Sequence, residues 1–349
     1  MHTTTVCSDA IASTVVEPDY PDYVVLETIA TPAGAIADLV VSPDGASLVA
    51  THYGTGAVSV VDTEDMAVAA VVPVHGDPML VTATGQRAYV AASAQSFDSV
   101  TVLDTESGEV VADHRFGDAV TALAVSQDGT RIVVGQVGRT DLGLAVINTF
   151  GRITTIDLGD GVGRTIDAVR VSPNGRLAYV ATSDAACGAL LVVDVVDARV
   201  LHEVAIASPI RDIALSRDGG LLYVASFHSH WGGSVDIVDT AINEITAKVG
   251  IGGAPMQMTL SADGARVYIA DYEHVAVLCT ETNSVIDRLT VTAEPSCVAV
   301  SPDGSRLYIA DHSGDIAVLA VAADELETEL MVANLSAAPE LRALEPAGV

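Results

Sequence analysis

The sequence predicts an all-β protein, a seven-bladed β-propeller with four antiparallel strands in each blade. Three observations support this fold: a turn phrase that recurs seven times, a spacing of 40 to 46 residues between its copies, and the same order of short apolar strands in each copy. A four-stranded sheet of this kind has two faces to bury, so no blade is stable alone. We therefore expect the copies to pack face to face around a ring.

The turn phrase is Ser-X-Asp-Gly, or Ser-X-Asn-Gly in one copy. Its second copy is degenerate and reads Ala83-Thr84-Gly85. Glycine tolerates a positive φ, so the phrase predicts a tight turn between the first and second strands of each blade. The seven glycines that mark the repeat are Gly45, Gly85, Gly129, Gly175, Gly219, Gly264 and Gly304.

The last copy shows the internal order of a blade. An apolar strand at 298–300 precedes the turn, a second strand follows at 306–310, and a third lies at 316–319. In most copies the third strand ends in Asp, as at Asp62, Asp104 and Asp239, and we expect this carboxylate to accept hydrogen bonds from the amides of the next turn. A more polar fourth strand closes each blade, for example at 109–112 or 244–248.

The ring must also be closed. Residues 23–29 lead into the first blade as a fourth strand would, so we expect them to complete the seventh blade from the N-terminal side. Residues 325–331 compete for the same edge and would otherwise form a peripheral or helical segment. The expected propeller spans 23–322, with a tail at 1–22 and a tail or peripheral segment at 323–349.

The second strands carry a shared tripeptide, Tyr-Val-Ala or Tyr-Ile-Ala. With the turn phrase and the Val-Ile-Asp-Thr-like third strands, it resembles the YVTN β-propeller family over roughly residues 23–322. The resemblance implies the propeller fold and, most often, a binding or scaffolding role. The matching tripeptides begin at Tyr89, Tyr179, Tyr223, Tyr268 and Tyr308, and the family's following Asn is replaced by Thr51, Ala92, Thr182, Ser226, Asp271 or Asp311.

The composition limits the classes of molecule that the protein is expected to bind. The chain has 16 Lys and Arg against 46 Asp and Glu, a net charge of −30, and this charge disfavours nucleic acid and anionic membranes. No apolar run is long enough for a membrane helix, and the N-terminus has no secretory signal pattern. Four irregularly spaced cysteines indicate reduced thiols. We therefore expect a soluble, acidic, cytoplasmic protein.

Candidate ligands gather on one face. We call it the loop face, formed by the loops that join strands two to three and four to one; these vary in sequence, whereas the turns of the opposite face are uniform. Imidazole binds zinc, copper or iron, so the sequence predicts one divalent transition metal at the channel mouth. The alternative is a set of solvated loop histidines. The five predicted metal ligands, from adjoining blades, are His52, His228, His230, His274 and His312, with Asp271, Glu273, Asp311 or Asp315 as oxygen ligands or supporting partners.

Three arginines lie across the ring from these histidines: Arg139, Arg164 and Arg211. They could bind the anionic end of a small molecule, or pair with Asp160, Asp167, Asp184 and Asp212 nearby. Trp231, the only tryptophan, is either a ligand platform or a packing residue. Two functions follow: a propeller that binds a small anionic molecule or a protein partner, possibly with a metal, or a metal-dependent lactonase, lyase or oxidoreductase centred on the histidines. No catalytic motif decides between them.

Overall fold

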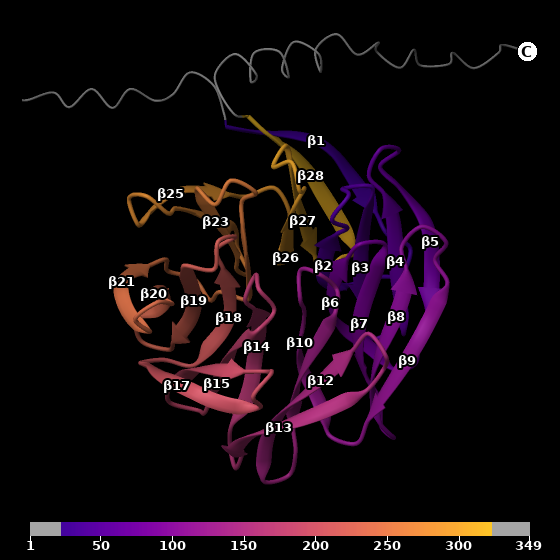
Figure 1. The fold of residues 1–349 in the computed structure, drawn as a ribbon. Helices are drawn as coiled ribbons and strands as arrows, with labels where there is room; N and C mark the ends of the chain where they lie inside the picture. Colours follow the sequence, from indigo (N-terminus) through magenta and orange to yellow (C-terminus); the bar gives the residue numbers. More distant parts are fainter. Residues whose placement is uncertain (1–21, 323–349) are drawn as a thin grey trace, which may run out of the picture.

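The computed structural model describes residues 22–322, which form seven four-stranded antiparallel sheets arranged in a ring (Figure 1). This confirms the predicted seven-bladed, all-β propeller. The expected N-terminal tail, apart from Asp22, and the segment at 325–331 lie outside the described residues.

Blades one to four follow the chain in order, each from its innermost to its outermost strand. Blade one is β2 (Ile36–Val41), β3 (Ser47–His52), β4 (Ala57–Asp62) and β5 (Ala67–Pro73); blade two is β6 (Asp77–Thr84), β7 (Arg87–Ser93), β8 (Asp98–Asp104) and β9 (Val110–Phe116). Blade three is β10 (Ala119–Val125), β11 (Arg131–Val137), β12 (Asp141–Asn148) and β13 (Ile153–Asp160); blade four is β14 (Thr165–Val171), β15 (Leu177–Ser183), β16 (Gly188–Asp194) and β17 (Arg199–Ile206).

Blades five and six repeat this order, and blade seven combines both ends of the described chain. Blade five is β18 (Ile210–Leu215), β19 (Leu221–His228), β20 (Gly232–Asp239) and β21 (Glu244–Gly250); blade six is β22 (Gln257–Leu260), β23 (Arg266–Ala270), β24 (Val275–Cys279) and β25 (Ser284–Leu289). Blade seven is β26 (Pro295–Val300), β27 (Arg306–Asp311), β28 (Asp315–Val321) and β1 (Tyr23–Ala30).

The turn phrase folds as the sequence predicts. In the last copy Gly304 has φ 77°, and its amide donates to the Ser301 carbonyl at 2.9 Å. The Ser301 hydroxyl donates to Asp303 at 2.5 Å and accepts from the amide of Arg306 at 2.9 Å. The side chains of the phrase thus satisfy the polar groups of the turn, which explains why Ser, Asp and Gly recur together.

The aspartate that ends the third strand also has the predicted role. Asp62 accepts hydrogen bonds from the amides of Glu64 and Asp65 at 2.8 and 2.9 Å. These bonds lower the pKa of the Asp62 carboxyl below its ordinary value, the Asp65 amide contributing most. Thr63 then donates to the carbonyl of Gly45 and joins the two turns of the blade.

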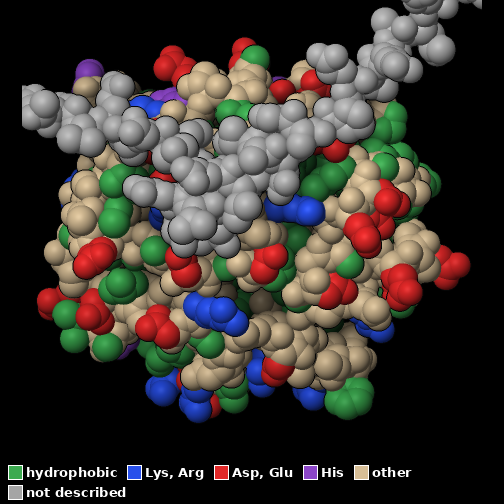
Figure 2. All heavy atoms as spheres, turned by 90° about the horizontal axis from the view of Figure 1, so that it is seen from above, with side chains coloured by type: hydrophobic (Ala, Val, Ile, Leu, Met, Phe, Trp, Pro, Cys, Tyr) green, Lys and Arg blue, Asp and Glu red, His purple; other side chains and the backbone are tan. Residues whose placement is uncertain are grey.

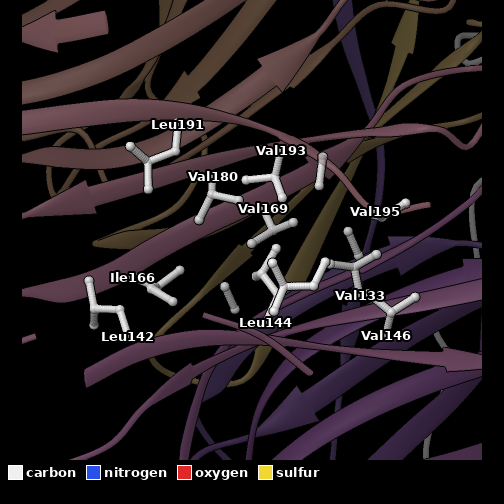
Figure 3. Close-up of a cluster of buried hydrophobic side chains, with 14 residues drawn as sticks. Val133, Leu142, Leu144, Val146, Ile166, Val169, Val180, Leu191, Val193 and Val195 are labelled. Carbon is white, nitrogen blue, oxygen red and sulfur yellow. The ribbon is translucent and has the colours of Figure 1, made fainter. Parts of the chain in front are cut away.

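Adjacent blades pack through apolar side chains on their facing sheets. Between blades three and four, Leu142, Leu144 and Val146 from β12 meet Ile166 and Val169 from β14 (Figure 3). All five are buried, and similar clusters fill the other blade interfaces. Each sheet is therefore buried on both faces, which accounts for the apolar inner three strands and the polar fourth strand.

The ring is closed by β1, as the sequence predicts. It pairs antiparallel with β28 from Tyr23 opposite Val321 to Ala30 opposite Asp315. Figure 1 shows it at the outer edge of blade seven. Ile29 of β1 is buried in the cluster shared by blades seven and one.

A polar contact also ties β1 to blade six. Arg266 of β23 donates to the Tyr23 hydroxyl at 2.7 Å and to Asp22 at 3.0 Å, and its guanidinium lies 5.5 Å from the Tyr23 ring centre. Tyr23 in turn donates to the Tyr268 hydroxyl at 3.3 Å, with the two rings edge to face. We name these four residues, Asp22, Tyr23, Arg266 and Tyr268, the closure latch.

We expect Arg266→Ala to lower the free energy of unfolding by about 1 to 2 kcal/mol, because it removes a charge-assisted bond and a cation–π contact from a partly buried tyrosine. Urea denaturation measures this change. Arg199→Ala is the matched control. Arg199 is exposed and forms a surface ion pair with Asp197 at 3.8 Å, and exposed pairs of this kind contribute little to stability. Equal losses in both variants would show that the latch adds nothing to closure.

Acidic side chains are spread over the face that Figure 2 shows rather than gathered in one patch. Lys and Arg side chains lie along its lower edge and also near its middle. Within the described part of the chain no helix is long and apolar enough to cross a membrane.

Candidate functional site

The innermost strands of the seven blades surround a central channel. It contains a cavity of about 640 Å³ lined by β2, β6, β10, β14, β18, β22 and β26. Six of these strands skip one residue in their register with the second strand, at the same place near the loop face. A bulge of this kind changes where side chains point, so these positions decide what the channel presents.

Asp38 and Gln257 form one polar pair in the channel wall. The amide of Gln257 donates to Asp38 Oδ1 at 2.7 Å, and its carbonyl accepts from the backbone amide of Val298 at 2.7 Å. Asp38 Oδ2 accepts from the amide of Val81 at 2.8 Å. These bonds connect blades one, two, six and seven across the point where the ring closes.

Asp212 and Arg170 form a second pair. The Arg170 guanidinium donates to Asp212 Oδ1 at 2.9 Å, and the amide of Met258 donates to Oδ2 at 2.8 Å. Asp212 therefore occupies in blade five the place that Asp38 occupies in blade one. Each carboxylate accepts an N–H from the free edge of the next inner strand, which would otherwise lack a protein partner.

Burial perturbs both carboxyl groups. It raises the pKa of Asp38 to about 7, the nearby Asp212 charge adds to this effect, and hydrogen bonds from Val81 and Leu39 and the charge of Arg170 oppose it. Burial also raises the pKa of Asp212, against the lowering effect of Arg170 and the backbone bonds. Burial thus favours the protonated form of both carboxyl groups more than at an exposed aspartate.

The positions of these two carboxylates in the sequence are a signal that could have identified the group. Asp38 and Asp212 are each the third residue of an apolar inner strand, in Ile36-Ala37-Asp38 and Ile210-Arg211-Asp212. A charged residue inside such a strand is expected only where a partner compensates it. The loop face carries most of the histidines, whereas the channel wall carries these paired carboxylates.

Two of the predicted metal ligands have both ring nitrogens engaged by protein. His52 is buried; its Nδ1 lies 2.8 Å from the Gly34 carbonyl and its Nε2 2.8 Å from the Ser59 hydroxyl. Burial lowers the pKa of His52, opposed by the bond to Gly34. His274 contacts Asp271 through Nδ1 at 3.1 Å and Arg288 through Nε2.

The other three histidines have contacts of their own. His228 Nδ1 accepts from the amide of His230 at 3.2 Å, and their rings are 5.6 Å apart. His312 is exposed, with its ring stacked 6.3 Å from that of Tyr272. Across 22–322, no group of three or more His, Cys, Asp or Glu side chains is arranged to hold a metal ion. The described residues therefore do not form the metal site that the sequence predicts from the five histidines.

Two of the four proposed oxygen ligands, Asp271 and Asp311, accept hydrogen bonds from the backbone of their own loops. Asp271 is buried and accepts from the amides of Glu273 and His274, both at 2.8 Å. Asp311 is also buried and accepts from the amides of Ser313, Gly314 and Asp315. The residue that follows Tyr-Ile-Ala in these two blades thus organises the loop after the second strand.

The three loop-face arginines are not held in ion pairs by any described residue. Arg211 lines the channel cavity, with its guanidinium 5.8 Å from the Phe227 ring centre. Arg164 donates to the Thr182 hydroxyl at 3.0 Å, and Arg139 is exposed. None of the three lies within 4.0 Å of a described carboxylate, in contrast to Arg170 and Arg176.

Trp231 projects from the loop between β19 and β20. Its side chain is 84% exposed, and its ring lies 6.2 Å from that of His228. The alternative of a buried packing residue therefore does not apply.

The fold and its channel define a seven-bladed β-propeller whose central cavity contains Asp38, Arg170, Arg211 and Asp212 among apolar side chains. The chain is 32% identical over 293 residues to the Seven-bladed beta-propeller protein Rv1057 of Mycobacterium tuberculosis, covering 71% of this chain and 72% of that protein. It is also 37% identical over 140 residues to a Seven-bladed beta-propeller protein of Mycolicibacterium smegmatis, covering 40% of this chain and 38% of that one. The chain belongs to this family of seven-bladed β-propeller proteins.

No protein-family model matches the chain. Among solved structures, Kuenenia stuttgartiensis Hydrazine Synthase superposes with a TM-score of 0.76 over 90% of this chain and 100% of the compared chain. The sequence identity is 21%, so this likeness shows the fold alone.

Proposed function

We propose that the protein binds a small anionic molecule at the loop-face mouth of the central channel, with Arg211 as its main contact. The observation that supports this is the state of Arg211: it lines the cavity and no described carboxylate lies within salt-bridge distance of it. Such a guanidinium is unusual in a chain with 46 acidic and 16 basic side chains. A carboxylate ligand would supply the missing partner by a charge-assisted, bidentate contact.

The surroundings of Arg211 favour this role. The adjacent Asp212 is already paired with Arg170 at 2.9 Å, so it does not occupy Arg211. Asp167 also lines the cavity; burial raises its pKa and the charge of Arg211 opposes this rise, but the two side chains are not within salt-bridge distance. The Phe227 ring supports the guanidinium from one side and leaves its N–H groups available. Arg164 lies on the same face, bound only to a neutral hydroxyl, and could extend the contact to a larger anion.

We expect Arg211→Ala to weaken binding of a dicarboxylate such as succinate by about tenfold or more, since one charge-assisted pair contributes roughly 1.5 to 3 kcal/mol. Arg164→Ala should weaken it less. Isothermal titration calorimetry measures the affinities, and stability should stay within roughly 0.5 kcal/mol of the wild type. Arg199→Ala, on the outer strand β17, is the matched control.

Two results would contradict this proposal: a wild type that binds no carboxylate, or an Arg211→Ala variant that binds as tightly as Arg199→Ala. Unfolding of the Arg211 and Arg164 variants would instead identify these arginines as structural.

A metal-dependent enzyme was the second candidate from the sequence. It would need a donor set without His52 and His274, because both ring nitrogens of each of these residues already contact other groups of the protein. Elemental analysis of purified protein tests it, with His228→Ala and His230→Ala as the informative variants. Stoichiometric metal lost in those variants would favour the enzyme.

A further inference from the structure

Exposed aromatic side chains gather on one arc of the loop face. Tyr53, Trp231 and Tyr272 are 58%, 84% and 56% exposed, and His312 stacks on Tyr272. They follow the second strands of blades one, five, six and seven, which adjoin across the closure. We name these four residues the aromatic rim. Solvent-exposed aromatic side chains on several adjoining loops indicate an interaction surface more often than isolated exposed aromatic side chains do.

The loops that carry the rim form a continuous surface. Between blades five and six, the amide of Gly233 donates to the Gly253 carbonyl at 3.0 Å, and Gly253 packs directly on Asp271, so closely that a Cβ there would overlap its carboxylate. The Tyr272 and His312 rings join blades six and seven. Between blades seven and one, Thr31 donates to the carbonyl of Gly314 at 2.7 Å.

The rim is also held in place before any partner arrives. The buried carboxylates of Asp271 and Asp311 fix the loops after β23 and β27 by the amide bonds described above. Tyr53 donates its own amide to the Ala35 carbonyl at 2.9 Å. Fixed loops lose little conformational entropy on binding, so their exposed rings can contribute most of their contact energy to a complex.

The charges beside the rim are negative. Glu273 and Glu294 are exposed next to Tyr272 and His312. The guanidinium of Arg288 is occupied by His274 and by the Ile251 carbonyl, the latter at 2.7 Å. With a net charge of −30 for the whole chain, this arc attracts cations and repels anions.

We propose that the aromatic rim binds a Lys- and Arg-rich segment of a partner protein. The faces of Trp and Tyr rings attract ammonium and guanidinium groups, and Glu273 and Glu294 would supply the ion pairs around them. The residues of the aromatic rim are separate from Arg211 and the channel mouth. The proposal for the rim and the proposal for the anion site can therefore be tested independently.

The test uses the full chain and a short synthetic peptide in which Arg and Lys alternate with Ser. Trp231 is the only tryptophan, so its fluorescence should change on titration and report contact at the rim itself. We expect Trp231→Ala and Tyr272→Ala each to weaken peptide binding, followed by anisotropy of a labelled peptide, by about tenfold. Glu273→Gln should weaken it less and reduce its salt dependence.

Phe150→Ala is the matched control, because Phe150 is 92% exposed but lies in the turn between β12 and β13 on the opposite face. It should bind the peptide as the wild type does. The proposal is overturned if the peptide does not bind, if an alternating Glu-Ser peptide binds equally well, or if the rim variants retain wild-type affinity. The last outcome would show attraction by the general acidic surface only.

Discussion

We expect deletion of residues 1–32 to lower the free energy of unfolding of the whole propeller by on the order of 5 kcal/mol. The deletion removes β1, and with it the ladder to β28, the buried Ile29 side chain and the Tyr23 end of the closure latch. Burial of one Ile contributes roughly 1.5 to 3 kcal/mol, and the hydrogen bonds of the latch add about 1 kcal/mol each. Loss of β1 also leaves β28 as an open edge.

Urea denaturation followed by circular dichroism measures this loss. Deletion of residues 1–21 is the matched control, since it keeps Asp22 and the whole of β1. If the longer deletion melts as the control does, β1 does not hold the ring closed. A broad, multistep transition in the longer deletion would support closure by β1, because blades of an open ring can unfold separately.

The fold could be predicted from sequence because its information is local and repeated. Each Ser-X-Asp-Gly phrase specifies its own turn through bonds that span at most five residues, as Ser301 to Arg306 shows. Seven copies at a blade-sized period then determine the blade number. Closure by β1 was also predictable, since 23–29 carry the pattern of a fourth strand and lead into β2.

The site was predicted less well because its contacts are long-range. Nothing local indicates that Gln257 meets Asp38 across 219 positions, or that His52 turns inward to Gly34 and Ser59. The loop histidines were correctly placed on neighbouring blades, but the direction of a ring depends on bonds that sequence position does not reveal. The position of Arg211 at the channel mouth was predictable because it lies at the start of an inner strand, β18, whereas its role in binding stays a prediction.

We expect Asp38 to make the free energy of unfolding depend on pH up to about pH 7, where most carboxyl groups are already ionised. Its pKa is raised from 3.8 to about 7 in the folded state. Between these values the unfolded chain is ionised while the folded protein still holds the proton, so stability falls as the pH rises. The shift corresponds to a loss of about 4 kcal/mol from pH 4 to pH 7, and above pH 7 this contribution is constant.

Asp38→Asn removes this titration, so the difference in unfolding free energy between wild type and variant should change steadily from pH 4.5 to 7. The direction is decisive: the wild type should lose stability relative to the variant as the pH rises. Asp128→Asn is the matched control, because hydrogen bonds from Ser126 and Thr130 lower the pKa of Asp128 to about 2, and its effect is complete above pH 4. Urea denaturation at half-unit pH intervals supplies both difference curves. A curve for Asp38→Asn as flat as that for Asp128→Asn would mean that Asp38 is ionised throughout, and that the bonds from Val81, Leu39 and Gln257 outweigh its burial.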